Sequence, residues 1–158
     1  MPDGVTITAR EDDPFAWALT VAGQLRSRAD LNAADREALS DFLEEWADDM
    51  LGAVRSQTVN LLAHAAKAAS TRNPDVVGHW RSQCVEFHDQ LVDAYRPSMH
   101  DKINMAALWR RAQRKVFASF EDNGEPRPSL PPQCPVSLDD LIDPELDLDR
   151  PVETIRNV

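Results

Sequence analysis

The stretch from Ala33 to Ser70 constrains the fold more than any other part of the chain, because it can form one very long helix. Apolar side chains recur along it at spacings of three and four residues, so they share one helix face: Leu39, Leu43, Trp46, Met50, Ala53, Leu61, Ala65 and Ala68. Asn32 and Asp35 cap its start, and Thr71-Arg72-Asn73-Pro74 stops it. Such a helix would be about 57 Å long, and Gly52 near its middle is a candidate bend.

Three further helices are predicted from their end signals. One opens at Asp13-Pro14 and runs to about residue 28, because an acceptor followed by proline is typical of a helix start. Another opens at Asn73-Pro74 and closes at Pro97. Ser98 and Asp101 then form a capping box that starts a fourth helix, which ends near residue 121. The connections are short, so neighbouring helices should be antiparallel.

The composition changes after Gly124. Five prolines in the next twelve residues exclude a helix or a central strand, so we expect an extended segment packed on the helices. Ser137 begins a short helix near 138–142, and the acidic residues 143–158 should be loosely held. The sequence therefore predicts a mobile N-terminal tail over 1–12, an all-α, up-and-down helical bundle over 13–122 with one very long helix, and a Pro-rich, acidic C-terminal tail over 123–158.

The chain is strongly acidic, with a net charge of −10. The charge is unevenly distributed: residues 1–66 carry −7, residues 67–120 carry +4, and residues 121–158 carry −7. An acidic surface disfavours nucleic acid as a partner, because such binding neutralises phosphates. No apolar run is long enough to span a membrane, and the first residues do not resemble a secretory signal. With only two cysteines, the sequence favours a cytoplasmic protein with reduced thiols.

The long helix should leave part of its apolar face uncovered. Neighbouring helices are too short to cover all of it, so Leu39, Phe42 and Trp46 would be only partly buried unless the C-terminal tail, a bend or a second copy of the chain covers them. This favours a non-enzymatic protein-interaction module that binds a protein partner or forms a homodimer. Two alternatives stay open: an enzyme or metal- or anion-binding protein, and an acidic, antitoxin-like regulator of a basic partner.

Three groups of side chains are candidate sites. His64, Lys67 and Trp80 could hold an anion or transfer a proton, although His64 also suits a boundary position. Cys84 and His88, one turn apart, could share a metal with further ligands such as His79 or His100, although a buried thiol explains Cys84 equally. A basic docking patch on the fourth helix could bind phosphate or an acidic partner: Arg110, Arg111, Arg114 and Lys115. The acidic tail or the helix dipole could instead account for this patch.

The sequence has no Gly-rich phosphate loop, G-x-S-x-G, H-E-x-x-H or C-x-x-C motif. We therefore expect no catalytic residue, cofactor or bound metal. An acidic turn on the long helix should be a solvated face rather than a cation site: Glu44, Glu45, Asp48 and Asp49.

Four segments occur in an order that resembles a bacterial family known as domain of unknown function number twenty-nine. They are Asp13-Pro14-Phe15-Ala16-Trp17-Ala18-Leu19, Glu44-Glu45 followed by Leu61-Leu62-Ala63-His64-Ala65-Ala66-Lys67, Trp80, and Cys134-Pro135-Val136-Ser137-Leu138. The resemblance covers roughly residues 12–145. The chain departs from the family in having alanines after His64 and no aromatic residue after Lys67. The resemblance implies a helical fold and carries no assigned activity.

Overall fold

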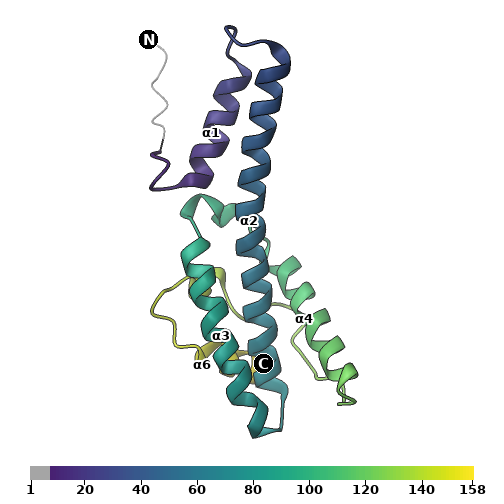
Figure 1. Ribbon diagram of the computed structural model, residues 1–158. Coiled ribbons are helices and arrows are strands. Elements are labelled where there is room, and N and C mark those ends of the chain that lie inside the picture. Colours follow the sequence, from purple (N-terminus) through teal and green to yellow (C-terminus); the bar gives the residue numbers. More distant parts are fainter. Residues whose placement is uncertain (1–7) are drawn as a thin grey trace. The chain divides into compact units, whose positions relative to one another are not determined.

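The computed structural model describes residues 8–158 and is helical throughout its regular structure (Figure 1). In chain order, the elements are α1 (Pro14–Arg26), α2 (Ala33–Ser70), α3 (Pro74–Ala94), the 3-10 helix η1 (Pro97–Lys102), α4 (Met105–Asp122), α5 (Leu138–Leu141) and α6 (Asp149–Arg156). Residues 8–158 contain no strand. The predicted all-α fold with one very long helix is confirmed, because α2 is continuous over 38 residues. Most of the expected N-terminal tail lies outside the described residues.

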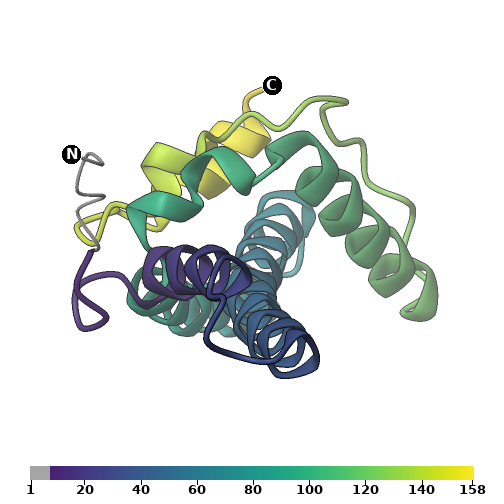
Figure 2. The ribbon, with the colours of Figure 1, turned by 90° about the horizontal axis from the view of Figure 1, so that it is seen from above.

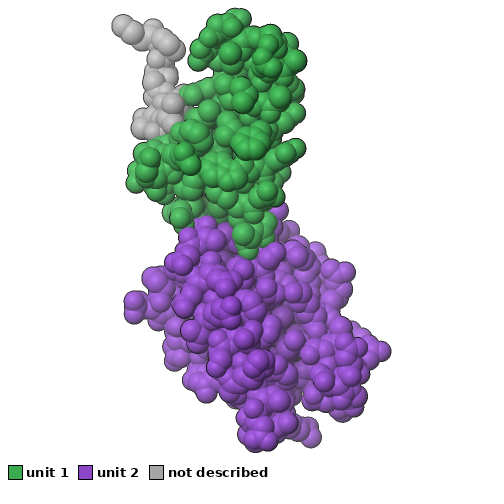
Figure 3. Space-filling model, viewed as in Figure 1, with its two compact units in different colours: residues 1–53, 96–102 green, residues 54–95, 103–158 purple. Residues whose placement is uncertain are grey.

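Helix α2 contributes to two compact units, coloured separately in Figure 3. Unit 1 contains residues 1–53 and 96–102, and unit 2 contains residues 54–95 and 103–158. The sequence analysis treated residues 13–122 as one bundle, whereas the structure divides this stretch within α2 and assigns η1 to the first unit. Within the described part of the chain, no helix is both long enough and apolar enough to cross a membrane.

Unit 1 is built from α1, the N-terminal half of α2, and η1. The buried core includes Phe15 and Ala22 of α1 and Ala47 of α2. The buried Ser40 hydroxyl donates to the carbonyl oxygen of Ala22 at 3.0 Å, which joins α2 to α1. Met99 of η1 is completely buried.

Asp13 joins α1 to η1 through its two carboxylate oxygens. Oδ1 accepts from the backbone N–H of Ala16 at 2.8 Å, which caps α1 as predicted. Oδ2 accepts from the Ser98 hydroxyl at 2.7 Å. The predicted start of the fourth helix at Ser98 is therefore wrong: Ser98 lies in η1, and α4 begins later, capped by Asn104 Oδ1, which accepts from the backbone N–H of Ala107 at 3.0 Å.

Unit 2 surrounds the C-terminal half of α2, which runs between α3 and α4 (Figure 1). Buried side chains are dense in this half and form a broad face: Val54, Thr58, Val59, Leu61, Leu62, Ala63, Ala65, Ala66 and Ala68. A helix face this broad must be covered by more than one neighbouring element. The small alanine side chains let the neighbouring elements approach its last turns closely.

The segment after α4 turns back from the end of that helix toward the last part of the chain (Figure 2) and completes unit 2. The carbonyl oxygen of Pro131 accepts two hydrogen bonds from α4, one from Trp109 Nε1 at 2.9 Å and one from Gln113 Nε2 at 2.8 Å. The predicted packing of the Pro-rich segment against the helices is thus seen in the structure. Ser137 caps the short helix α5, as its sequence indicates, by accepting from the backbone N–H of Asp140 at 3.1 Å.

The expectation that residues 143–158 are loosely held needs correction. Residues 149–156 form α6, which buries Pro151, Val152 and Ile155. These three apolar side chains supply the packing energy that holds the helix, because a helix of eight residues is unstable in isolation.

Candidate functional site

His64 lies half-buried on α2 within unit 2. Its Nδ1 is 2.8 Å from the carbonyl oxygen of Asn60, one turn earlier, so this nitrogen must carry the hydrogen. Its ring packs against Phe87 of α3, with 4.9 Å between ring centroids. Burial lowers the pKa of His64, and the nearby positive charges of Lys67 and Lys115 lower it further. The imidazole is therefore held in one orientation, with Nε2 as its remaining free nitrogen.

Two lysines accompany His64. Lys67 is half-buried three residues later on α2, and Lys115 reaches across from α4 to donate from Nζ to Asn60 Oδ1 at 2.7 Å. Burial lowers the pKa of Lys67, and repulsion by Lys115 adds to this effect. We call Asn60, His64, Lys67 and Lys115 the Asn60 cluster.

Trp80, the third residue predicted for the anion site, makes its ring contact with α4. Its ring packs against Phe120 of α4, with 6.4 Å between centroids. Across residues 8–158, no hydrogen bond or ring contact joins Trp80 to His64 or Lys67. The sequence therefore found two members of the Asn60 cluster as candidates for one site, and the structure adds Asn60 and Lys115 to them.

All four side chains of the predicted basic docking patch on α4 are exposed: Arg110, Arg111, Arg114 and Lys115. Lys115 also belongs to the Asn60 cluster through its bond to Asn60. Two ion pairs of the acidic C-terminal segment are Asp149 with Arg81 of α3 and Asp140 with Arg150, the latter at 3.6 Å. Neither pair involves a residue of this patch.

Cys84 and His88 are both buried, one turn apart on α3. Burial raises the pKa of the Cys84 thiol to about 12, so it stays protonated at neutral pH. His88 uses Nε2 to donate to the carbonyl oxygen of Asp143 at 3.0 Å. In residues 8–158, no group of three or more His, Cys, Asp or Glu side chains could hold a metal ion. His88 thus has a structural partner 55 residues away that local spacing could not reveal.

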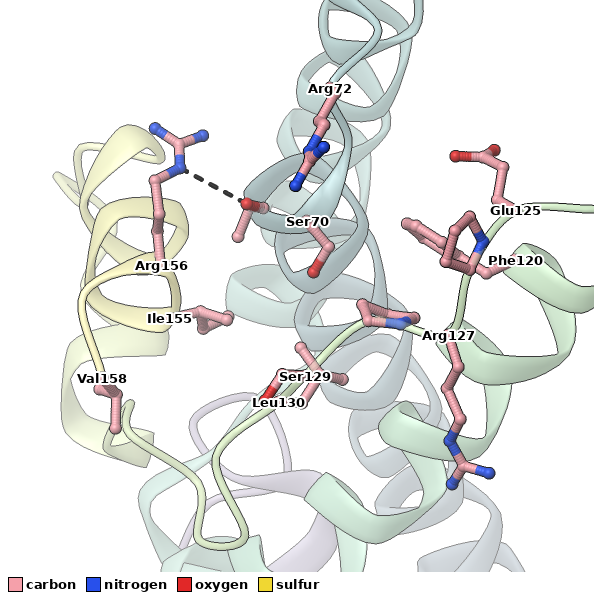
Figure 4. Close-up of a pocket in the computed structure, with 13 residues that line it drawn as sticks. Ser70, Arg72, Phe120, Glu125, Arg127, Ser129, Leu130, Ile155, Arg156 and Val158 are labelled. Atoms are coloured by element: carbon pink, nitrogen blue, oxygen red, sulfur yellow. Dashed lines mark hydrogen bonds between the residues drawn. The ribbon is translucent and has the colours of Figure 1, made fainter.

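A pocket of about 600 Å³ lies beside the end of α2 in unit 2 (Figure 4). Three arginines line it, together with Glu125. Arg156 directs its guanidinium to the carbonyl oxygens of Ala68 and Ala69, at 3.4 and 3.5 Å, where a cation complements the helix dipole.

The other two arginines of this pocket differ in orientation. Arg127 places its guanidinium carbon 3.8 Å from the ring centroid of Phe117, a cation–π contact. In Figure 4 this side chain extends away from Ser70, whereas Arg72 points toward it. Two of the three guanidinium groups are therefore engaged by the protein itself, and sequence reasoning did not single out this pocket.

Two large apolar side chains of unit 1 are exposed on α2. Phe42 of α2 is 65% exposed, and Leu39, one turn earlier, is 47% exposed. Trp46, one turn after Phe42, is half-buried and meets Trp17 of α1 edge to face at 6.5 Å. Leu39, Phe42 and Trp46 therefore form a continuous strip, which we call the Phe42 face.

Acidic residues border the Phe42 face. Glu45 and Asp49 lie three and seven residues after Phe42, so they share its side of the helix. In the described chain neither makes an ion pair. Glu44, by contrast, pairs with Arg26 of α1, and this contact lowers its pKa. The predicted solvated acidic turn is thus exposed at Glu45, Asp48 and Asp49.

Comparison with solved structures finds an α-helical protein of unknown function from Rhodospirillum rubrum ATCC 11170, known from a crystal structure. It is 28% identical to this chain, covers 92% of it and 96% of its own length, and superposes with a TM-score of 0.84. No curated protein of established function matches the chain. The family described as Domain of unknown function DUF29 matches residues 10–146. Because this match spans most of the sequence, the protein belongs to the DUF29 family.

Proposed function

We propose that the protein is a non-enzymatic interaction module that docks a basic, amphipathic segment of another protein on its Phe42 face. The observation that carries this proposal is the exposure of Leu39 and Phe42 on consecutive turns of α2. When a partner covers large apolar side chains that lie next to each other, their removal from water lowers the free energy of the complex. We place this work in the cytoplasm, which suits two free cysteines.

The charges around the Phe42 face favour a basic partner. Glu45 and Asp49 leave two carboxylates exposed beside it, and neither has an ion pair in the described residues. A second copy of the chain would bring the same acidic border against itself, and like charges across an interface are unfavourable. Lysines or arginines flanking apolar anchor residues would instead pair with this border, as in helix-in-groove recognition.

A designed peptide tests the proposal directly. The probe is a helix of about 18 residues with leucines at every third or fourth position and lysines on its other face. Fluorescence anisotropy of the labelled peptide measures its Kd for the intact protein. A matched peptide with glutamates in place of the lysines should bind at least about tenfold more weakly, because it meets the acidic border with like charge.

Variants locate the binding surface. The double change Leu39→Ser and Phe42→Ser should weaken binding of the basic peptide at least about tenfold. Val85→Ser is the matched control, since Val85 is an apolar residue of α3 that is 50% exposed; it should leave the Kd unchanged. Equal binding of both peptides, or equal loss in the control, would overturn the proposal. A dimer in light scattering that the double change dissolves would assign the face to a second copy instead.

A further inference from the structure

Two of the three lysines in the chain meet at the Asn60 cluster. Lys67 is half-buried and makes no hydrogen bond or ion pair in residues 8–158. Lys115 bonds to the neutral amide oxygen of Asn60 and to no carboxylate within the described chain. Because a charge withdrawn from water is usually paired, the missing counter-ion of the half-buried Lys67 is informative.

The side chains of the cluster converge from different elements. Asn60, His64 and Lys67 stand at positions i, i+4 and i+7 of α2, which places them on one side of the helix over two turns. Lys115 comes from α4 and is fixed by its 2.7 Å bond to Asn60. His64 is fixed by the Asn60 carbonyl and the Phe87 ring, so that Nε2 is its free nitrogen. The cluster therefore offers two ammonium groups and one imidazole nitrogen.

The fold holds these groups together at a cost. Burial disfavours charge on Lys67 and on His64, and Lys115 repels both. Groups whose pKa values are shifted by burial and by neighbouring charges cluster at functional sites. An oxyanion beside Lys67 and Lys115 would remove the repulsion and supply acceptors for their hydrogens.

We propose that the Asn60 cluster binds the phosphate group of a small molecule or free inorganic phosphate. The Lys67 and Lys115 ammonium groups would donate to its oxygens, and His64 would donate from Nε2 once protonated. Two or three positive charges suit a phosphate, which carries between one and two negative charges near neutral pH. This site lies on unit 2 and is independent of the Phe42 face, so either proposal can fail without the other.

Amine labelling tests the site on the unmodified protein. With a lysine-selective acylating reagent and mass spectrometry, the labelling rates of all three lysines can be followed together. Inorganic phosphate at ten times its Kd should slow labelling of Lys67 and Lys115 about tenfold, while Lys102 of unit 1 keeps its rate and serves as the internal control. Chloride at equal ionic strength should protect none of them.

Variants and a second ligand complete the test. Lys67→Gln and Lys115→Gln should each raise the Kd for phosphate, measured by calorimetry, about tenfold, and Lys102→Gln should not change it. Glycerol phosphate distinguishes the ligand sources: tighter binding than inorganic phosphate indicates a phosphorylated small molecule, and equal or weaker binding indicates phosphate itself. Uniform protection of all three lysines, or no protection at all, would refute the site. If a glutamine variant fails to fold, the labelling pattern of the unmodified protein decides alone.

Discussion

Replacement of Trp109 by phenylalanine is expected to lower the free energy of unfolding by about 1.5–3.5 kcal/mol. Trp109 is 1% exposed, and its indole N–H donates to the carbonyl oxygen of Pro131 at 2.9 Å. Loss of one intramolecular hydrogen bond costs about 0.5–1.5 kcal/mol. The smaller ring removes buried apolar contact and leaves a gap worth about 1–2 kcal/mol.

The second bond to Pro131 limits this loss. Gln113 Nε2 still donates to the same carbonyl oxygen at 2.8 Å, so Trp109→Phe alone does not leave a buried acceptor without a partner. Adding Gln113→Leu removes the remaining donor, and an unsatisfied buried carbonyl costs about 1–3 kcal/mol. The double variant should therefore be less stable than the sum of the two single changes indicates.

Urea unfolding followed by far-UV circular dichroism measures these differences. Trp80→Phe is the matched control, because Trp80 is half-buried and its ring contact with Phe120 involves no hydrogen bond. It should lose less stability than Trp109→Phe. The reasoning is refuted if Trp109→Phe changes stability by less than about 0.5 kcal/mol, or if the two tryptophan changes cost the same.

Two further predictions concern α3. Since burial raises the pKa of Cys84 to about 12, from about 8.5 in an unfolded chain, its stabilising contribution is complete below the unfolded value and is lost as the pH rises toward 12. Between pH 9 and 10.5 the unmodified protein should lose about 2 kcal/mol more stability than Cys84→Ala in urea unfolding; parallel pH curves would contradict this. His88→Ala should cost about 2–4 kcal/mol, because it removes buried volume and the donor to the Asp143 carbonyl, and should speed proteolysis after residue 143. His79→Ala, an exposed control, should do neither.

Local signals predicted the elements that local interactions determine. The spacing of apolar residues predicted α2 throughout its length, and Asp13 and Asn73 act as the caps that their positions indicate. Ser98 shows the limit of this reasoning. Its hydroxyl bonds to Asp13, 85 residues earlier, in place of the N-cap predicted from the nearby sequence. A tertiary partner of this kind leaves no local pattern.

Helix α6 was missed for a related reason. Its buried side chains Val152 and Ile155 show the right spacing, but its N-cap residue is Leu148, which has no acceptor in its side chain. The first backbone N–H, that of Asp149, donates to Asp147 Oδ1 at 3.0 Å instead. Its stability comes from packing within unit 2 more than from helix propensity.

The members of the Asn60 cluster that lie close together in the sequence were predictable, and the member from another helix was not. His64 and Lys67 are three residues apart on one helix, so sequence alone could pair them. Lys115 joins them only through its bond to Asn60, 55 residues away. The sequence analysis assigned Lys115 to a patch with its α4 neighbours, since a helix pattern does not show which neighbour a long side chain reaches. The sequence analysis grouped Trp80 with His64. It could not show that the Trp80 ring packs on Phe120 of α4, because that contact joins two helices.

The assignment of η1 to unit 1 has a consequence for synthesis of the chain. Residues 1–53 are made before Ser98 and Met99, so unit 1 lacks the hydrogen-bond partner of Asp13 and the buried Met99 side chain at that point. The segment of unit 1 that holds both is complete only after another 49 residues, at Lys102. At cellular translation rates this delay is about 2–10 s. During that interval the earliest-made helices cannot reach their final packing, while the rest of α2 and all of α3 are made before η1.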